Sequence, residues 1–129
     1  MGRLLQAVVA LLGCLFVLTG VQWLVMPDIV APQFGLELSV GLGLSSQVGD
    51  MAAFFLLLGF CSLWAVANKQ PHWLYPASLL LVLTAVGRVV AWLIHDAAFA
   101  GDMILVELMS AAILGLAAKR LTTELAKNG

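Results

Sequence analysis

The sequence predicts an all-α, membrane-embedded antiparallel four-helix bundle, and two observations lead to that prediction. First, 63% of the 129 residues are hydrophobic and only 10% are charged, whereas soluble domains are about 45–50% apolar. Second, four apolar runs, at about 4–26, 51–67, 74–94 and 103–118, approach the ~20 residues with which a helix crosses a bilayer. We therefore expect a single four-span transmembrane domain over residues 1–129.

The first run follows Arg3 and continues to Met26, where Pro27 ends the helix because proline cannot extend its hydrogen-bond ladder. The stretch from Leu11 to Cys14 resembles a lipoprotein cleavage box. However, the apolar run is longer than the ~7–15 residues of a signal-peptide core. We expect this helix to be retained as the first span.

The segment 27–49 shows a different pattern. From Phe34 to Leu44 every even position is apolar, and the odd positions hold mainly glycine, serine or glutamate. Strict alternation is typical of an extended strand with one buried face. We expect an extended or hairpin-like outer loop between the first two spans, and an irregular loop remains the alternative. In either form it lies outside the hydrocarbon, where a lone strand has no partners for its amides.

The remaining spans have recognisable ends. Asp50 precedes the second run and suits a helix N-terminus, where it can act as an N-cap. Pro76 falls in the first turn of the third run, where its missing amide is tolerated. Lys119-Arg120 closes the fourth run, and the tail 121–129 frays or extends the helix into water. Short connections between the last three spans predict antiparallel neighbours.

The distribution of basic residues predicts the orientation. The loops 27–49 and 95–102 hold no lysine or arginine, but they hold four of the acids, and a fifth, Asp50, directly follows the first loop. Lysine and arginine favour the cytoplasmic side, so we expect a multi-pass protein of the inner (plasma) membrane with both termini cytoplasmic. The basic residues outside the spans, all at the termini or in the 68–72 turn, are Arg3, Lys69, Lys119, Arg120 and Lys127.

Arg88 is the one basic residue within a span, and Glu107 is the one acid clearly within a span. Arg88 lies about 9 Å below the outer end of the third span and Glu107 about 6 Å below that of the fourth, at 1.5 Å per residue. We therefore expect the two to pair in the outer leaflet, with a bidentate guanidinium. Asp50 is expected within reach, so that one arginine serves two carboxylates.

Helical spacing adds neighbours to this site. Thr84, Trp92 and His95 share the face of Arg88, so Trp92 is expected to cover the guanidinium by a cation–π contact. Three interpretations stay open. The pair is a structural clasp between the last two spans, or part of a polar pocket that binds a ligand headgroup or anion, or part of an ion path.

The residues predict few other kinds of chemistry. The net charge of −1 offers no basic stripe for a nucleic-acid partner. Cys14 and Cys61 lie within apolar runs and are interpreted as packing residues. His95, Asp96, Asp102 and Asp50 lack the spacing of a metal site, and no nucleophile system or phosphate loop is present. We expect no catalytic residues, no metal and no cofactor.

Several short motifs carry a resemblance. They are Gly49-Asp50 through Leu58-Gly59, Gly87-Arg88, His95-Asp96, and Glu107 in the last span. In these the chain resembles a family of small bacterial four-span membrane proteins, domain-of-unknown-function family 4345, over nearly its whole length. The chain differs from the family at position 50, where it has Asp50 and a longer acid or an arginine would be expected. The resemblance implies an inner-membrane location and no particular activity. A looser likeness, at the level of fold, is to four-helix membrane proteins of the DoxX type and to sterol-pathway scaffold proteins.

Two functions are compatible with these features. The first is a non-enzymatic integral membrane protein that binds an apolar or amphipathic ligand, or a partner helix. Its polar site would comprise Arg88, Glu107, Asp50, Trp92 and His95. The alternative is a small transporter or channel subunit that acts as an oligomer, because four short helices barely enclose a pore. The expected partners are membrane lipid, a hydrophobic ligand, and further copies of the chain or a larger membrane complex.

Overall fold

The computed structural model describes residues 2–129, and this part of the chain contains helices and no strand. The long helices are α1 (Gly2–Val25), α3 (Leu42–Ala67), α4 (Leu74–Ile94) and α5 (Gly101–Asn128). Each is long and apolar enough to cross a membrane. The all-α fold is confirmed, and the four apolar helices indicate a multi-pass membrane protein.

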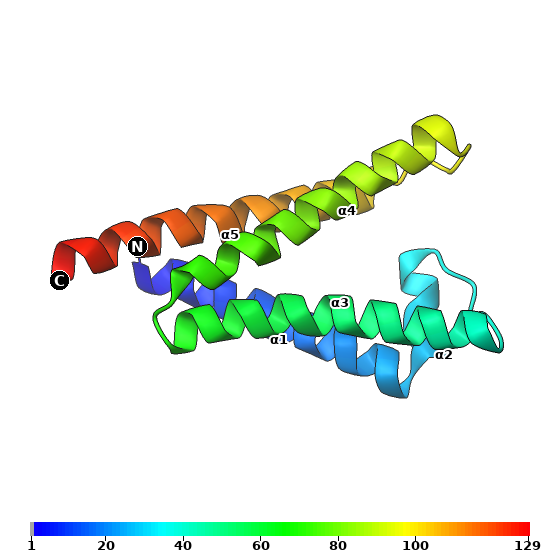
Figure 1. Ribbon diagram of the computed structural model, residues 1–129, viewed down its shortest axis with the longest axis horizontal. Helices are drawn as coiled ribbons and strands as arrows, with labels where there is room; N and C mark the ends of the chain where they lie inside the picture. The colour runs from blue at the N-terminus through cyan, green and yellow to red at the C-terminus, as the bar shows by residue number, and fades with distance from the viewer. Residues whose placement is uncertain (1) are drawn as a thin grey trace.

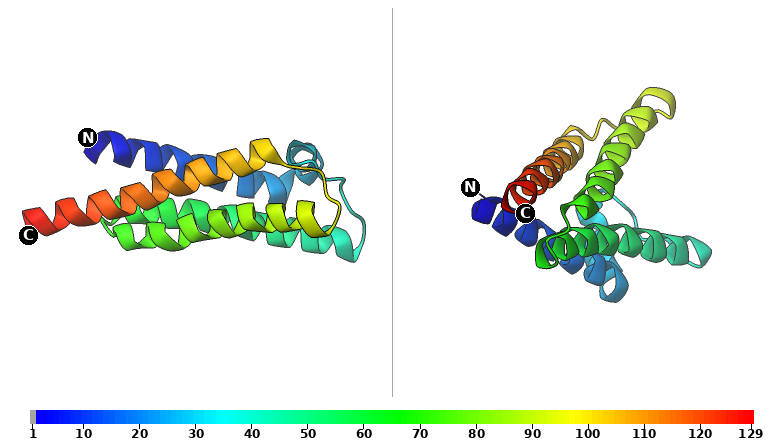
Figure 2. Two further views of the ribbon diagram at one scale, coloured as in Figure 1. Left: turned by 90° about the horizontal axis from the view of Figure 1, so that it is seen from above. Right: turned by 60° about the vertical axis from the view of Figure 1, so that its left-hand side comes forward.

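The four long helices form two pairs. α1 packs along α3, and α4 packs along α5, with fewer contacts between the pairs. The pairs meet at the end where both termini lie and diverge toward the opposite end (Figure 1). The pairs also diverge in the right-hand view of Figure 2, which is turned by 60° about the vertical axis. The bundle is therefore closed at one end and open at the other.

Glycines allow the close approach of α1 and α3. A Cβ atom on Gly59 would lie 2.8 Å from the Gly13 carbonyl oxygen and 2.8 Å from the Val17 amide nitrogen. Neither is a flexible side-chain end that could move aside. Small residues let helix backbones approach in this way in membranes, so Gly59 and Gly13 set the geometry of the α1–α3 pair.

The chain after α1 folds back over the open end of the bundle. α1 ends at Val25, next to Pro27 as predicted, and is followed by α2 (Pro27–Val30) and the 3-10 helix η1 (Ala31–Phe34). Val30 and Ala31 are fully buried. The Phe34 ring lies 6.1 Å from that of the buried Trp23. This turn, which we call the outer hook (residues 27–35), lies between the two helix pairs in Figure 1.

The predicted outer loop forms no strand or hairpin within residues 2–129, and the irregular alternative describes it better. Residues 36–40 have no regular structure, and α3 begins at Leu42 rather than at 51. The apolar side chains of the alternating pattern do not form one buried face of a sheet. Two of them, Val40 and Leu42, are 86% and 89% exposed. Hydrogen bonds from a side chain take the place of the backbone hydrogen bonds of a sheet. The Gln47 side chain accepts from the Ser39 amide (2.9 Å) and donates to the Glu37 carbonyl (2.8 Å).

The end at which the termini lie differs less from expectation. The 68–70 turn and the 3-10 helix η2 (Pro71–Trp73) connect α3 to α4. α5 continues to Asn128 instead of ending at 118, so the tail extends the last helix. The fold therefore brings α3, α4 and α5 around one opening at the end opposite the termini, where the outer hook, named after the predicted outer loop, also lies.

Candidate functional site

A cavity of about 640 Å³ lies between the two helix pairs, within the ~300–1,000 Å³ typical of small-molecule sites. Its walls come from α1, η1, α3, α4 and α5, and we call it the cleft. The apolar part of the wall consists of Phe16, Phe34, Met51, Phe54, Phe55, Leu81, Met103 and Val106. The polar part consists of Gln33, Asp50, Thr84, Arg88, Asp102, Glu107 and Ser110.

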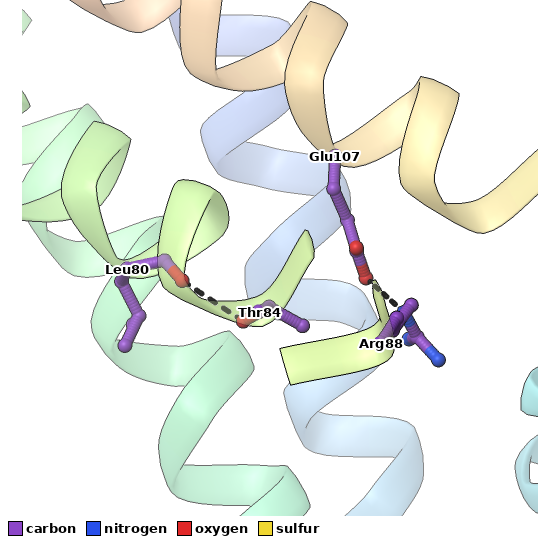
Figure 3. A network of polar contacts seen from close by, with 4 residues as sticks. All are labelled: Leu80, Thr84, Arg88 and Glu107. Carbon is purple, nitrogen blue, oxygen red and sulfur yellow. Dashed lines mark hydrogen bonds and ion pairs between the residues drawn. The ribbon is translucent and has the colours of Figure 1, made fainter. Parts of the chain in front are cut away.

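Arg88 of α4 and Glu107 of α5 form an ion pair in the wall of the cleft. Arg88 Nε donates to Glu107 Oε1 at 2.8 Å, as Figure 3 shows. The two side chains are 27% and 12% exposed, so water screens the pair weakly. The sequence predicted that Arg88 and Glu107 lie at equal depth and pair, and in the structure they are in direct contact.

The pairing is simpler than the bidentate arrangement that we predicted. Only Nε reaches the carboxylate, and in Figure 3 the far end of the guanidinium points away from Glu107. Glu107 Oε2 is buried and has no hydrogen-bond partner within residues 2–129. A bidentate pair through this side of the guanidinium would need a terminal nitrogen to donate to Oε2 as well, and no such bond forms within residues 2–129. One carboxylate oxygen and two guanidinium nitrogens thus remain unpaired by the described chain.

Asp50 lies in the wall of the same cleft, but it does not have the position that we predicted. α3 begins at Leu42, so Asp50 lies two turns inside the helix and cannot be its N-cap. No hydrogen bond or ion pair joins it to Arg88 in the described part of the chain. Its side chain is exposed, and Arg88 therefore serves one carboxylate in the structure rather than two.

Trp92 and His95 are placed away from the cleft. Trp92 is 46% exposed and packs its ring 4.9 Å from Phe99 in the loop between α4 and α5. The predicted cation–π contact between Trp92 and the Arg88 guanidinium is therefore wrong. Trp92 lies one turn beyond Arg88 on α4, and its side chain packs against this loop instead. His95 is exposed and follows the last residue of α4. Neither residue is among those that line the cleft.

Sequence reasoning missed the contribution of the outer hook. Gln33 and Phe34 line the cleft, and the Phe34 ring also lies 5.1 Å from that of Phe55 on α3. The only local signals were Pro27 and Pro32, which mark turns but do not say where the chain returns. The direction of return depends on packing between residues distant in sequence, which no local pattern reports.

Among residues 2–129, no group of three or more histidine, cysteine or acidic side chains is placed to hold a metal ion. The lining of the cleft supplies groups that can contact a ligand. It combines apolar and aromatic walls with a charged pair, two further carboxylates and an amide.

Comparisons with protein-family models, with curated proteins and with solved structures gave no match to this chain.

Proposed function

We propose that this chain is a non-enzymatic membrane protein that binds an apolar or amphipathic molecule in the cleft between its two helix pairs. Arg88, Glu107 and Asp50 would hold the polar head, and the aromatic and aliphatic wall would hold the apolar body. One observation supports this above all: a cavity of about 640 Å³ has a mainly apolar lining and an ion pair in its wall.

The alternative role of the pair as a clasp between α4 and α5 is weaker. These helices already have another link, because Ser78 Oγ donates to the Ala111 carbonyl at 2.8 Å. If the pair were a clasp, the buried polar atoms of both side chains would also be expected to have hydrogen-bond partners, since a buried polar atom without a partner costs about 1–3 kcal/mol. Glu107 Oε2 lacks such a partner within residues 2–129. Incomplete pairing at a cavity wall favours a binding role.

The proposal includes an orientation in the membrane. The two termini and the α3–α4 turn lie at one end of the molecule (Figure 1). The lysines and the other arginines belong to these segments, and such residues favour the cytoplasmic side. We therefore place the open end of the cleft toward the outer face. The inner-membrane location is carried by the resemblance to domain-of-unknown-function family 4345, which is itself part of the proposal.

A transporter or channel subunit is the second candidate, and the open cleft with charged residues is what favours it. Such a function needs a path to the inner side. The predicted spans 4–26, 51–67, 74–94 and 103–118 carry no acidic residue, lysine, arginine or histidine in their inner halves, so the path would have to form between copies of the chain. Binding requires no such assembly and is the simpler function of the cleft.

The test is native mass spectrometry of the full chain released from a mild detergent. The wild-type protein is expected to retain a small apolar molecule, and Arg88→Ala is expected to lower the retained fraction several-fold. Lys119→Ala is the matched control, because it removes a positive charge from an exposed position outside the cleft. Equal retention by wild type, Arg88→Ala and Lys119→Ala would contradict a role of Arg88 in binding.

Flux measurements separate the two candidates. In proteoliposomes, a transporter should show proton- or ion-coupled flux that Glu107→Gln abolishes, whereas a binding protein should show none. If Arg88→Ala and Glu107→Gln lower thermal stability alone, with no effect on retention or flux, the pair is a clasp.

A further inference from the structure

We infer that the polar head of the ligand is a protonated amine, so that the cleft accepts a cationic amphiphile in preference to an anionic one. This inference rests on the proposed binding function and adds the chemical class of the ligand: the carboxylates hold the ammonium head, and Arg88 contributes by holding the Glu107 carboxylate in the cleft wall. It follows from the charges, the hydrogen-bonding groups and the aromatic residues of the cleft.

The charges in the cleft wall favour a cation. The positive charge of Arg88 is largely offset by the carboxylate of Glu107, which Arg88 Nε contacts at 2.8 Å, although its two terminal nitrogens stay unpaired within residues 2–129. Asp50 and Asp102 add two exposed carboxylates to the same wall, and neither forms an ion pair within residues 2–129. One positive and three negative groups leave an excess of negative charge. A ligand anion would be repelled by the two free carboxylates, whereas an ammonium group would be attracted.

The hydrogen-bonding groups of the wall favour a donor. Gln33 Nε2 donates one of its two N–H groups to the Ile29 carbonyl at 3.5 Å, so its amide oxygen can accept from a ligand and one N–H is left beside it. Thr84 Oγ1 donates to the Leu80 carbonyl at 2.8 Å, as Figure 3 shows, so it can only accept from a ligand. Together with the carboxylates of Asp50 and Asp102, these groups form a set of acceptors. An ammonium group has three donors and no acceptor, and it matches this set.

The rest of the wall is compatible with a cation that carries an apolar chain. Phe34, Phe54 and Met51 lie in the same wall as Asp50. Aromatic faces attract cations as well as apolar groups, so a head that passes along these rings meets no unfavourable surface. The outer hook brings Gln33 and Phe34 to the cleft together, one as acceptor and one as aromatic wall.

The test is competition among three amphiphiles with the same alkyl chain: dodecylamine, dodecanol and dodecanoate. The full-length protein in mild detergent is mixed with all three at equal concentration and neutral pH, and native mass spectrometry measures each bound species. We expect dodecylamine to exceed dodecanoate by about tenfold, from the attraction and repulsion of the free carboxylates. Asp50→Asn and Asp102→Asn should each lower dodecylamine binding several-fold, while Asp28→Asn, an exposed acid outside the cleft, should leave it unchanged.

The outcomes separate this inference from the proposed function. If dodecanoate or dodecanol binds as well as dodecylamine, or if both cleft variants bind dodecylamine like the wild type, the amine inference is overturned. The cleft would then still bind amphiphiles. If the wild-type protein binds none of the three, both the amine inference and the binding function are overturned. Because Asp50 and Asp102 are exposed, their substitution by asparagine leaves the fold intact, and thermal unfolding of each variant checks this.

Discussion

Glu107 is the residue at which structure and function are most closely linked. Its side chain is 12% exposed, and its carboxylate has one hydrogen bond, to Arg88 Nε. The sequence allowed this contact to be predicted, because helical rise and a short loop place both residues at one depth. It did not predict the atoms that meet, nor the turn of Trp92 toward Phe99. Side-chain rotamers depend on packing that local spacing does not describe.

Removing one partner of this pair should destabilise the protein more than removing both. Arg88→Leu leaves the carboxylate of Glu107 buried without its partner, and we expect a loss of up to about 3 kcal/mol in the free energy of unfolding. The double variant Arg88→Leu with Glu107→Leu leaves no orphan charge and should recover at least half of that loss. Equilibrium unfolding in detergent measures both. A double variant as unstable as the single one would contradict the prediction.

At the scale of elements, the sequence predicted the long helices well and the outer segment poorly. α1 and α4 match their predicted spans within a few residues, because long apolar runs and prolines mark them clearly. α3 begins nine residues before the predicted position of 51. Alternation over 34–44 indicated an extended chain, but no second strand is available to pair with it in the described residues. Tertiary context therefore decided the structure there.

The α1–α3 pair offers a test of helix packing. Gly59→Ala places a methyl group against the backbone of α1 at Gly13 and Val17, and we expect it to lower the free energy of unfolding by about 1–3 kcal/mol. Gly87→Ala is the matched control, because no atom lies within 4 Å of its added Cβ. It should leave stability unchanged or raise it by up to about 1 kcal/mol. Equal effects of the two changes, measured by thermal unfolding, would argue against close packing at Gly59.

The loop between the outer hook and α3 should depend on Gln47. Gln47→Ala removes its bonds to the Ser39 amide and the Glu37 carbonyl, and each such bond contributes about 0.5–1.5 kcal/mol. We expect faster hydrogen exchange at the Ser39 amide while the long helices exchange as before. Ser46→Ala, a change at the exposed neighbouring position, serves as the control. Unchanged exchange at Ser39 in Gln47→Ala would show that these bonds do not hold the loop.

At the scale of the whole molecule, the two helix pairs form a wedge, closed where the termini lie and open beneath the outer hook (Figure 1). The four spans and their antiparallel order were predicted from composition and loop length. The divergence of the pairs was not, because it depends on which helices pack together and at what angle. The cleft is a consequence of this divergence, and Arg88 and Glu107 lie in its wall.

The proposed orientation predicts which loops face outward. In a variant without Cys14 and Cys61, a cysteine at Ala98 should react with a membrane-impermeant maleimide added to intact cells. A cysteine at Asn68 should react only after the cells are opened. Both positions are exposed, so accessibility depends on the side of the membrane. The reverse pattern would place the termini and the α3–α4 turn outside.

The most direct test of the central claim, that the cleft is a ligand site, compares two tryptophan substitutions on α5. Val106→Trp adds bulk in the cleft, and Leu105→Trp adds it at a neighbouring position outside the cleft lining; the two residues are 62% and 59% exposed. Native mass spectrometry measures the small molecule that each variant retains. The binding account predicts that Leu105→Trp retains it like the wild type and that Val106→Trp loses it. Equal retention by both variants would show that the molecule lies elsewhere, and no retention even by the wild type would remove the basis for the claim.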